Sequence, residues 1–297
     1  MKKLFLSLLA LFASASFLMS ASLSGTYTST QTISENSYVA SGNEYVVNMS
    51  SGHGIDVKSG CTLTVQEKGK LLIKGSSPDG AGMYVYGTFK TEADTNVKVP
   101  RFVMFADKAT LSLQTAITRE DGSAFGLAVA HDNTTLSSTV SQTITQWDVR
   151  NNNFTLDFTK DVVYTFNSLS LYNVQSSLLY RNFNVNLTNF DDSNEIVLYL
   201  GESGAGYDVK IEDTKLVVEG IMTKKYGSGS TPAEMGRGTV KYNFVCDEDI
   251  TINEMFDNNG KLTGYTISTI QAVPEPAEWA IILGAIALGF AVYRLKK

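Results

Sequence analysis

The chain of 297 residues has few of the residues that define several protein classes. Two cysteines exclude a disulfide-dense scaffold, and two histidines leave little for a histidine-based metal site. Acidic residues outnumber basic ones, 30 to 24, so no basic face for nucleic acid is expected. Five prolines, 24 glycines and no dominant residue exclude collagen-like and low-complexity chains. The chain is long enough for a sizeable hydrophobic core.

The first residues have the pattern of an export signal peptide. Two lysines near the start precede an apolar run over residues 4–19, and small residues follow it. A short positive region, a short hydrophobic core and a small-residue exit are typical of a cleaved secretory signal. We therefore predict a signal peptide at residues 1–21 and an exported domain at residues 22–272. Cleavage after Ala13-Ser14-Ala15 is the alternative.

The C-terminus combines a proline-flanked glutamate, an apolar run and a basic tail. The motif is Pro274, Glu275 and Pro276, the uncharged run covers residues 279–293, and the terminal basic residues are Arg294, Lys296 and Lys297. We expect a transmembrane helix over the uncharged run. It would span roughly 22 Å, and flanking charged side chains can snorkel to lengthen its reach. The terminal basic residues would hold that end in the cytoplasm, so the preceding domain would lie outside.

In this order, these features resemble the PEP-CTERM sorting signal. The resemblance covers residues 273–297, and the signal peptide accompanies it. It implies a Gram-negative bacterial protein handled by an exosortase, a membrane cysteine-type transpeptidase expected to cleave near the motif. The implied partners are the export machinery, the exosortase, the inner membrane before processing, and exopolysaccharide, since proteins of this type are associated with exopolysaccharide and biofilm production. An ordinary C-terminal anchor is the alternative.

Residues 22–272 carry the alternating pattern of β-strands, so we predict an all-β domain. No window shows a sustained helical period, whereas apolar and polar residues alternate in many short segments. Three such segments, Ile55–Val57, Leu63–Val65 and Leu71–Ile73, recur every eight residues, with glycines near the turns. This recurrence favours a parallel β-helix, or β-solenoid, in which short strands stack coil upon coil. A β-sandwich is the alternative.

No motif assigns a catalytic, cofactor or metal site to this domain. It has no Gly-x-Ser-x-Gly elbow, and its glycine-rich segment at residues 201–206 lacks the Gly-Lys-Ser/Thr of a phosphate-binding loop. His53 and His131 have serines and aspartates nearby, but chance explains this proximity in a chain so rich in both. Acidic clusters at residues 191–195 and 247–249 offer oxygen ligands for Ca²⁺, yet solvated acidic turns are the favoured interpretation.

Cys61 and Cys246 lie beside strand residues of the exported domain. Export permits oxidation, and a disulfide between them would stabilise the fold by roughly 5 kcal/mol through loop-closure entropy. Burial as two small hydrophobic side chains fits equally well. The sequence leaves both alternatives open.

The sequence predicts a non-enzymatic surface or extracellular-matrix protein with a structural or adhesive role. A carbohydrate-binding or polysaccharide-degrading β-helix protein is the alternative. Tyr38, Tyr45, Tyr84 and Tyr86 fall in strand-like stretches, where we expect them to fill a half-buried face rather than to bind sugar. Five of the 24 basic and two of the 30 acidic residues lie in the processed ends, which leaves the domain a formal net charge of −9.

Overall fold

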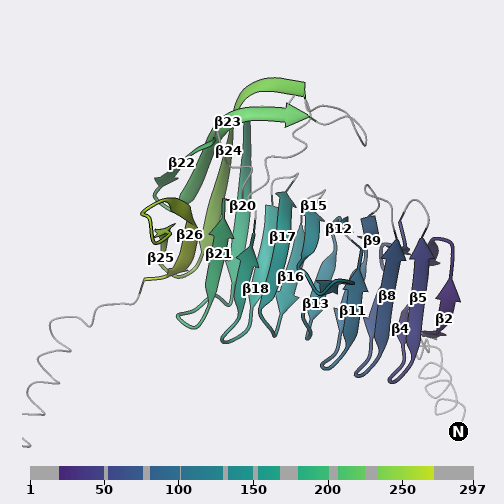
Figure 1. The fold of residues 1–297 in the computed structure, drawn as a ribbon. Helices are drawn as coiled ribbons and strands as arrows, with labels where there is room; N and C mark the ends of the chain where they lie inside the picture. The colour runs from purple at the N-terminus through teal and green to yellow at the C-terminus, as the bar shows by residue number, and fades with distance from the viewer. Residues whose placement is uncertain are drawn as a thin grey trace, which may run out of the picture.

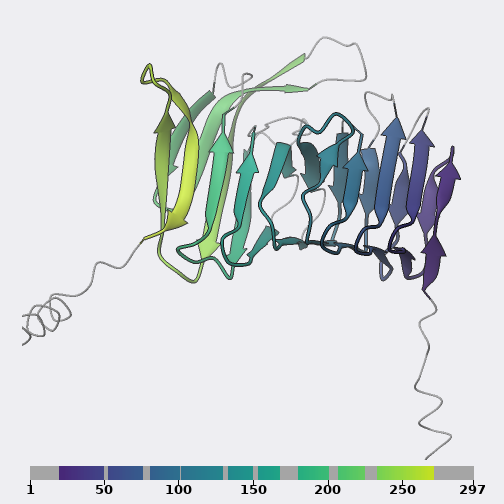
Figure 2. The same cartoon turned by 60° about the horizontal axis from the view of Figure 1, so that its bottom comes forward.

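The computed structural model describes most of residues 22–272. Described are residues 20–49, 53–75, 81–100, 102–129, 133–149, 153–167, 180–200, 207–224 and 233–270. Within these ranges the chain forms β-strands and turns and no helix, which confirms the all-β prediction. The strands form three sheets, and Figures 1 and 2 show them as an elongated stack.

The three sheets are called A, B and C. In spatial order, sheet A contains β1 (Ala21–Leu23), β4 (Ser37–Val39), β7 (Thr62–Val65), β10 (Thr88–Thr91), β13 (Thr110–Leu113), β16 (Thr134–Ser138), β18 (Asn153–Phe158), β20 (Tyr180–Thr188), β24 (Ala233–Cys246), β23 (Lys215–Lys224) and β22 (Tyr207–Glu212). Sheet B contains β14 (Thr118–Arg119), β11 (Asn96–Val99), β8 (Lys70–Gly75), β5 (Glu44–Met49) and β2 (Gly25–Tyr27). Sheet C contains β25 (Ile250–Phe256), β26 (Leu262–Thr269), β21 (Glu195–Tyr199), β19 (Val163–Phe166), β17 (Gln142–Val149), β15 (Phe125–Val129), β12 (Phe102–Ala106), β9 (Ala81–Val85), β6 (Ile55–Val57) and β3 (Gln31–Ile33).

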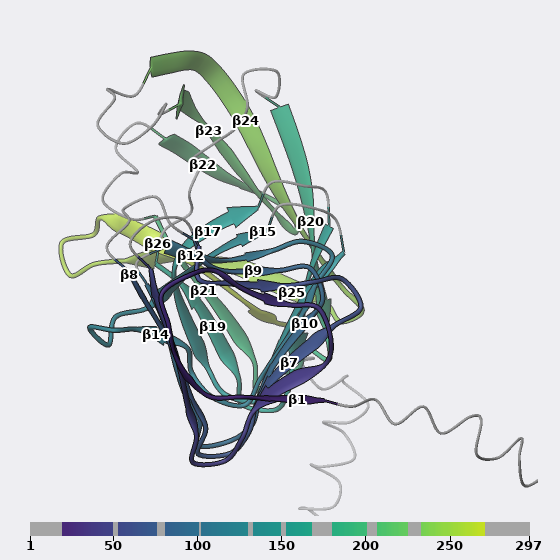
Figure 3. The ribbon, with the colours of Figure 1, turned by 90° about the vertical axis from the view of Figure 1, so that its right-hand side faces the viewer.

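The chain visits the sheets in turn, so that each coil adds one strand to each. The first coil is β1, β2 and β3, the second is β4, β5 and β6, and the pattern continues to β15. Neighbouring strands are parallel, as in the pairing of β4 with β7 and of β7 with β10. This is a solenoid-like arrangement (Figure 3), and it differs from the antiparallel pairing on which the sandwich alternative depends. The eight-residue recurrence corresponds to β6, β7 and β8, one strand from each sheet.

The core lies inside the coils because alternate side chains of each strand point inward. In sheet A, Leu63, Phe89, Leu111, Leu136 and Leu156 occupy equivalent positions on five successive strands, and each is fully buried. Since side chains alternate along a strand, the residues on either side of each one face outward. Stacking of like positions on successive coils therefore gives one continuous hydrophobic core and regular columns on the outer surface.

Sheet B ends at β14, and after it the described strands belong to sheets A and C. Gln142, at the start of β17, is buried where the third sheet stops. Its side-chain amide donates to the carbonyl oxygen of Thr115 (2.9 Å) and to Oγ of Ser138 (3.0 Å), and its Oε1 accepts from the backbone N–H of Ile117 (3.3 Å). This one side chain satisfies backbone groups of the segment that leads into the last strand of sheet B.

Antiparallel strands close the C-terminal end of the stack. In sheet A, β22, β23 and β24 form an antiparallel set, and β24 pairs in parallel with β20. In sheet C, β26 lies between β25 and β21 and pairs antiparallel with both. The pattern of coils is therefore parallel through most of the body and antiparallel at this end (Figure 1).

Candidate functional site

The outer surface of sheet A carries a column of threonines in register. Thr62, Thr88, Thr110, Thr135 and Thr155 occupy equivalent positions on β7, β10, β13, β16 and β18. Neighbouring members are about 4.8 Å apart, the spacing between paired strands. A second column, two residues further along each strand, consists of Thr64, Lys90, Ser112, Ser137 and Asp157. We call the eight serines and threonines of these two columns the hydroxyl face.

The hydroxyl face is open to solvent and nearly free of charge. Each of its side chains is exposed or half-buried, and Lys90 and Asp157 are the charged residues within the two columns. Among the described residues, the hydroxyl groups of the five threonines in the first column have no hydrogen-bond partner in the protein. β-branched side chains have few rotamers, so the column presents donors and acceptors in a fixed, repeating arrangement.

Asp157 closes the second column at one end. Its carboxylate accepts hydrogen bonds from Oγ of Ser137 (2.8 Å), from Oγ1 of Thr188 (2.9 Å) and from Nδ2 of Asn189 (2.7 Å). These neutral donors solvate the carboxylate, which is half-buried. The serine and threonine nearest to Asp157 are therefore occupied, while the threonines of the first column remain available.

A ladder of asparagines continues the same outer surface toward the C-terminal end. Asn153, Asn184 and Asn243 lie in register on β18, β20 and β24. Nδ2 of Asn184 donates to Oδ1 of Asn153 (3.0 Å), and Nδ2 of Asn243 donates to Oδ1 of Asn184 (3.1 Å). Asn153 precedes Thr155 by two residues, so the ladder lies beside the threonine column. Sheet A therefore presents hydroxyl groups on its middle strands and amides on its later ones.

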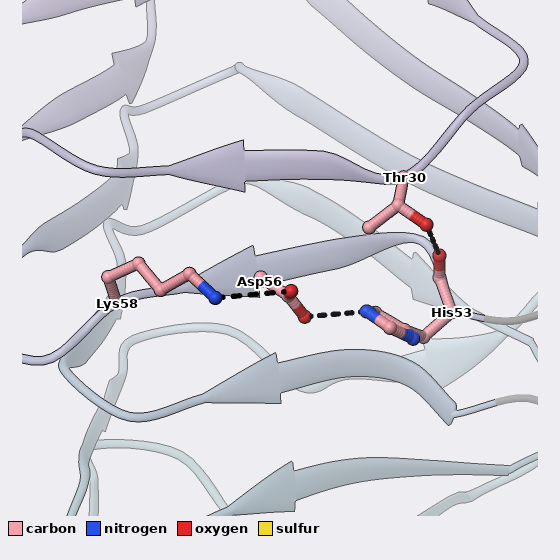
Figure 4. Close-up of polar contacts among 4 residues, drawn as sticks. All are labelled: Thr30, His53, Asp56 and Lys58. Carbon is pink, nitrogen blue, oxygen red and sulfur yellow. Dashed lines mark hydrogen bonds and ion pairs between the residues drawn. The ribbon is translucent and has the colours of Figure 1, made fainter.

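A second group of polar residues gathers on the outside of sheet C, around β6 (Figure 4). Nε2 of His53 lies 2.8 Å from Oδ1 of Asp56, and Nζ of Lys58 lies 3.4 Å from Oδ2 of the same carboxylate. Oγ1 of Thr30 donates to the carbonyl oxygen of His53 (2.8 Å), which ties the residue to the neighbouring coil. Asp56 faces outward because Ile55 and Val57 on either side of it are fully buried.

Two tyrosines of the next coil complete this group, which we call the His53 cluster: His53, Asp56, Lys58, Tyr84 and Tyr86. Asp56 is in register with Tyr84, whose ring meets the His53 ring edge to face at a centroid distance of 4.6 Å. The ring planes of Tyr84 and Tyr86 are nearly parallel, with an interplanar angle of 4° and centroids 6.3 Å apart. Burial raises the pKa of Tyr86, and Asp56 raises it further, so its phenol stays protonated and able to donate.

The His53 cluster can hold a hydroxyl-bearing ligand. A carboxylate that fixes an imidazole is the pairing that orients a general base, and the same groups hydrogen-bond to sugar hydroxyls. The side chains of His53 and Asp56 are 33% and 16% exposed, so the pair is reachable from solvent and partly desolvated. From the sequence, chance was the expected explanation for aspartates near His53, but Asp56 contacts its imidazole directly.

The sequence-predicted processing residues lie outside the described part of the chain. This holds for Pro274, Glu275 and Pro276, for the basic residues Arg294, Lys296 and Lys297, for the expected helix at residues 279–293 and for nearly all of the signal peptide at residues 1–21. Within the described ranges, no helix has the length and apolar character needed to cross a bilayer. These assignments stay predictions.

The two cysteines are free and far apart. Cys61 precedes β7 and Cys246 ends β24, six strand spacings away in sheet A, which is roughly 29 Å. A disulfide needs Cα atoms within about 7 Å of each other. The intramolecular disulfide that the sequence left open is therefore absent, and both side chains pack against the core as partly buried hydrophobes. Burial raises the pKa of the Cys246 thiol, which keeps it protonated.

The first acidic cluster, residues 191–195, is a turn in which Asp191 and Asp192 are exposed, as expected, although Asn194 is buried and Glu195 begins β21. Asp191 lies between β20 and β21, and its Oδ1 accepts from the backbone N–H (2.9 Å) and from Oγ (2.6 Å) of Ser193. These hydrogen bonds lower the pKa of Asp191, and the positive charge of Lys160 adds to the effect. Asp247, Glu248 and Asp249 form the exposed turn between β24 and β25. No group of three potential metal ligands occurs among the residues that the structure describes.

Neither candidate surface was predicted from the sequence, although the sequence contains a signal for the hydroxyl face. Strand segments such as Thr62-Leu63-Thr64, Thr110-Leu111-Ser112 and Thr135-Leu136-Ser137 share a hydroxyl–leucine–hydroxyl pattern. Their unequal spacing along the chain hides the register that the coils create. Comparison of the chain with protein-family models, with curated proteins and with solved structures gives no match.

Proposed function

We propose that the chain is an exported surface or extracellular-matrix protein of a Gram-negative bacterium, sorted by an exosortase through Pro274-Glu275-Pro276. Its solenoid-like domain has a structural or adhesive role and associates with exopolysaccharide. It acts by display and binding rather than by catalysis. The hydroxyl face of sheet A is the observation that supports the binding role.

The two ends of the chain support the proposed route of export and sorting. The signal peptide would direct export, and the apolar run at residues 279–293 would halt in the inner membrane, held by the basic residues that follow it. Cleavage near the Pro-Glu-Pro motif would then release the domain for attachment at the cell surface or in the matrix. Each step rests on the sequence of these ends.

A repeating face suits a repeating ligand. A polysaccharide offers hydroxyl groups at regular intervals, and five unoccupied threonine hydroxyls in register can meet several of them at once. Each hydrogen bond contributes only about 1 kcal/mol, so affinity arises from the number of bonds along the column. The face is nearly uncharged and the exported domain is acidic, which favours a neutral polysaccharide over an acidic one.

Removing hydroxyl groups from the column tests the proposal. Thr88→Val, Thr110→Val and Thr135→Val, combined in one variant, keep the β-branched shape and delete three hydroxyls. We expect binding of a neutral polysaccharide, with dextran and a β-glucan as probes and alginate as the acidic comparison, to weaken by about tenfold to a hundredfold. Affinity is measured by calorimetry or affinity electrophoresis.

A matched control places the same changes on sheet C. Thr143, Thr165 and Thr266 face outward from β17, β19 and β26, and their combined change to valine should leave binding as in the wild type. Wild-type protein that binds neither neutral probe, or a sheet A variant that binds as well as the control, would contradict a polysaccharide-binding hydroxyl face. Equal loss in both variants would point to a general change of the fold.

The sorting route has its own test. Mass analysis of the mature protein from cells with an active exosortase should show a C-terminus near residues 274–276. Cells that lack the exosortase should retain the full tail. Mature protein that keeps residues 279–297 in the presence of the enzyme would exclude the sorting signal and leave the ordinary anchor.

A polysaccharide-degrading enzyme is the second candidate, and the His53–Asp56 pair with its two tyrosines favours it. In that role His53 would act as the base and Asp56 would orient it. The same neutral and acidic polysaccharides would release new reducing ends on incubation, and Asp56→Asn would lower that rate while leaving binding nearly unchanged. Wild-type protein that releases no ends from any of them would remove this candidate.

A further inference from the structure

The first coil leaves three strand edges open at the N-terminal end of the stack. β1, β2 and β3 are the outermost strands of sheets A, B and C, so their free edges point the same way along the axis (Figure 3). Each pairs with the following coil, β1 with β4, β2 with β5 and β3 with β6, and with no other described strand. An open edge is a template on which another β-strand can pair.

This end lacks the features that usually protect an edge. Residues 20–34, which form the first coil, contain no charged residue and no proline. Lysines, other charges and prolines are what natural edge strands use to prevent pairing. Five strand positions of this coil, among them Ser22, Thr26 and Thr32, are nonetheless exposed. The first coil is therefore both accessible and unprotected.

The other edges in the described part of the chain are protected. β22, at the edge of sheet A, carries Asp208, Lys210 and Glu212. Lys210 pairs with Glu219 of β23, and Glu212 pairs with Lys241 of β24. β25, at the edge of sheet C, carries Glu254. β14 has two residues, one of them Arg119, and an antiparallel bridge between Thr118 and Ala124 covers it. Charge is thus present at every edge except those of the first coil.

An aromatic side chain is exposed at the same end. Tyr27 of β2 is 39% exposed, and its ring lies 5.2 Å from that of Tyr45, which is buried in the next coil. Covering the ring of Tyr27 would remove apolar surface from water, at about 25 cal/mol per Å². Backbone pairing and burial of Tyr27 would therefore favour the same partner.

We propose that the mature protein forms a head-to-head dimer in which the first coils of two copies pair with each other. A partner has to offer three uncharged strand edges at once, and the described end that does so is the first coil of another copy. The contact is isologous and uses up this end of both copies, so it closes at two rather than growing into a fibre. It goes beyond the proposed function and depends on its export step, because removal of residues 1–21 would start the chain within β1.

Charging the edge tests the dimer. The mature protein is purified from the producing cells, and its mass establishes that residues 1–21 are absent. Light scattering after size exclusion should then give the dimer mass across the micromolar range. Thr26→Lys with Thr32→Lys places like charges opposite each other in the paired coils. We expect the dissociation constant of the dimer to increase by about tenfold or more.

The control carries the same two changes away from the edge. Thr110→Lys with Thr143→Lys alters exposed threonines on internal strands of sheets A and C, and it should dimerise like the wild type. Hydrogen exchange adds the location, since backbone amides of β1, β2 and β3 should gain protection as concentration rises, and lose it in the edge variant. A monomeric wild type, an edge variant that dimerises normally, or open-ended oligomers would each overturn the proposal. A retained signal peptide, seen in the mass, would instead contradict the export step.

Discussion

The coils before β15 and those after it enclose their cores with different side chains. Among the residues up to Ile117 whose burial the structure describes, the buried aromatic ones are Tyr45 and Phe89, and the other buried hydrophobic residues are aliphatic apart from Met83. From Phe125 on, rings supply much of the core: Phe125, Phe154, Phe158, Tyr164, Phe166, Phe183, Phe190, Tyr242, Phe244 and Tyr265. The change coincides with the end of sheet B. Where the third sheet stops, larger side chains fill the interior between sheets A and C.

The rings of the second region also hold the two sheets together. Phe158 of β18 in sheet A meets Tyr164 of β19 in sheet C at a centroid distance of 4.8 Å and an angle of 77°. It meets Phe190, in the turn after β20, at 4.8 Å and 62°. Edge-to-face geometry adds about 1 kcal/mol to the burial of each ring. The aliphatic region depends on burial, and the aromatic region depends on burial together with ring orientation.

The largest expected effect is the loss of Phe158. Phe158→Ala should lower the free energy of unfolding by about 4 kcal/mol, because it leaves a cavity and removes two ring contacts, whereas Leu63→Ala in the aliphatic region should cost about 3 kcal/mol. Urea denaturation followed by circular dichroism measures both. Phe256→Ala, at a position that is 56% exposed, is the control and should be nearly neutral. A larger effect for Leu63 would mean that the rings do not distinguish the two regions.

A smaller effect is expected at the junction between the regions. Gln142→Leu keeps the side chain buried and removes its three hydrogen bonds, which leaves backbone groups of Thr115 and Ile117 unsatisfied. We expect a loss of about 2–3 kcal/mol and faster hydrogen exchange at the Ile117 amide. The exposed Gln114 provides the control, and Gln114→Leu should change stability by less than about 0.5 kcal/mol. Unchanged exchange at Ile117 would show that Gln142 does not secure the end of sheet B.

The smallest effect is expected in alkali. Burial raises the pKa of Tyr45, in the aliphatic region, from 10.0 to about 12. The folded state therefore holds the phenolic proton to a higher pH than the unfolded state does. The contribution of Tyr45 is fully present below about pH 10 and declines as the pH rises toward 12. Between about pH 10 and 12, the free energy of unfolding of Tyr45→Phe should fall less steeply with pH than that of the wild type. Urea denaturation at a series of pH values measures both slopes. Equal slopes would contradict a raised pKa of Tyr45 in the folded state.

The sequence predicted the class of fold because each strand has a local signal in the alternation of its side chains. Inward leucine, valine and isoleucine alternate with outward polar residues, and β6, β7 and β8 recur at an interval that matches one side of a coil. Later coils lose sheet B and contain longer strands, so the interval changes and the periodicity fades. The sequence also showed that Asp191 and its neighbours form a turn, because aspartate, serine and asparagine occur together there.

The candidate sites could not be predicted because they depend on register between coils. Thr62 and Thr88 become neighbours only when β7 and β10 pair, and no local pattern fixes the number of residues in a coil. Tyr84 contacts His53 for the same reason, because β9 of the next coil pairs with β6. For the cysteines, the sequence gives their separation along the chain but not the five strands that lie between β7 and β24 in the sheet.

The position of β26 determines how the domain responds to mechanical force. A pull on the chain beyond Ile270 enters through β26, which has β25 on one side and β21 on the other. Antiparallel hydrogen bonds run perpendicular to the strand. Such a pull therefore loads the hydrogen bonds to β25 and those to β21 in shear at the same time, and does not break them one by one. A pull at the opposite end would peel β1 from its single neighbour, β4. A domain held by its C-terminus would therefore resist tension best from the side on which it is tethered.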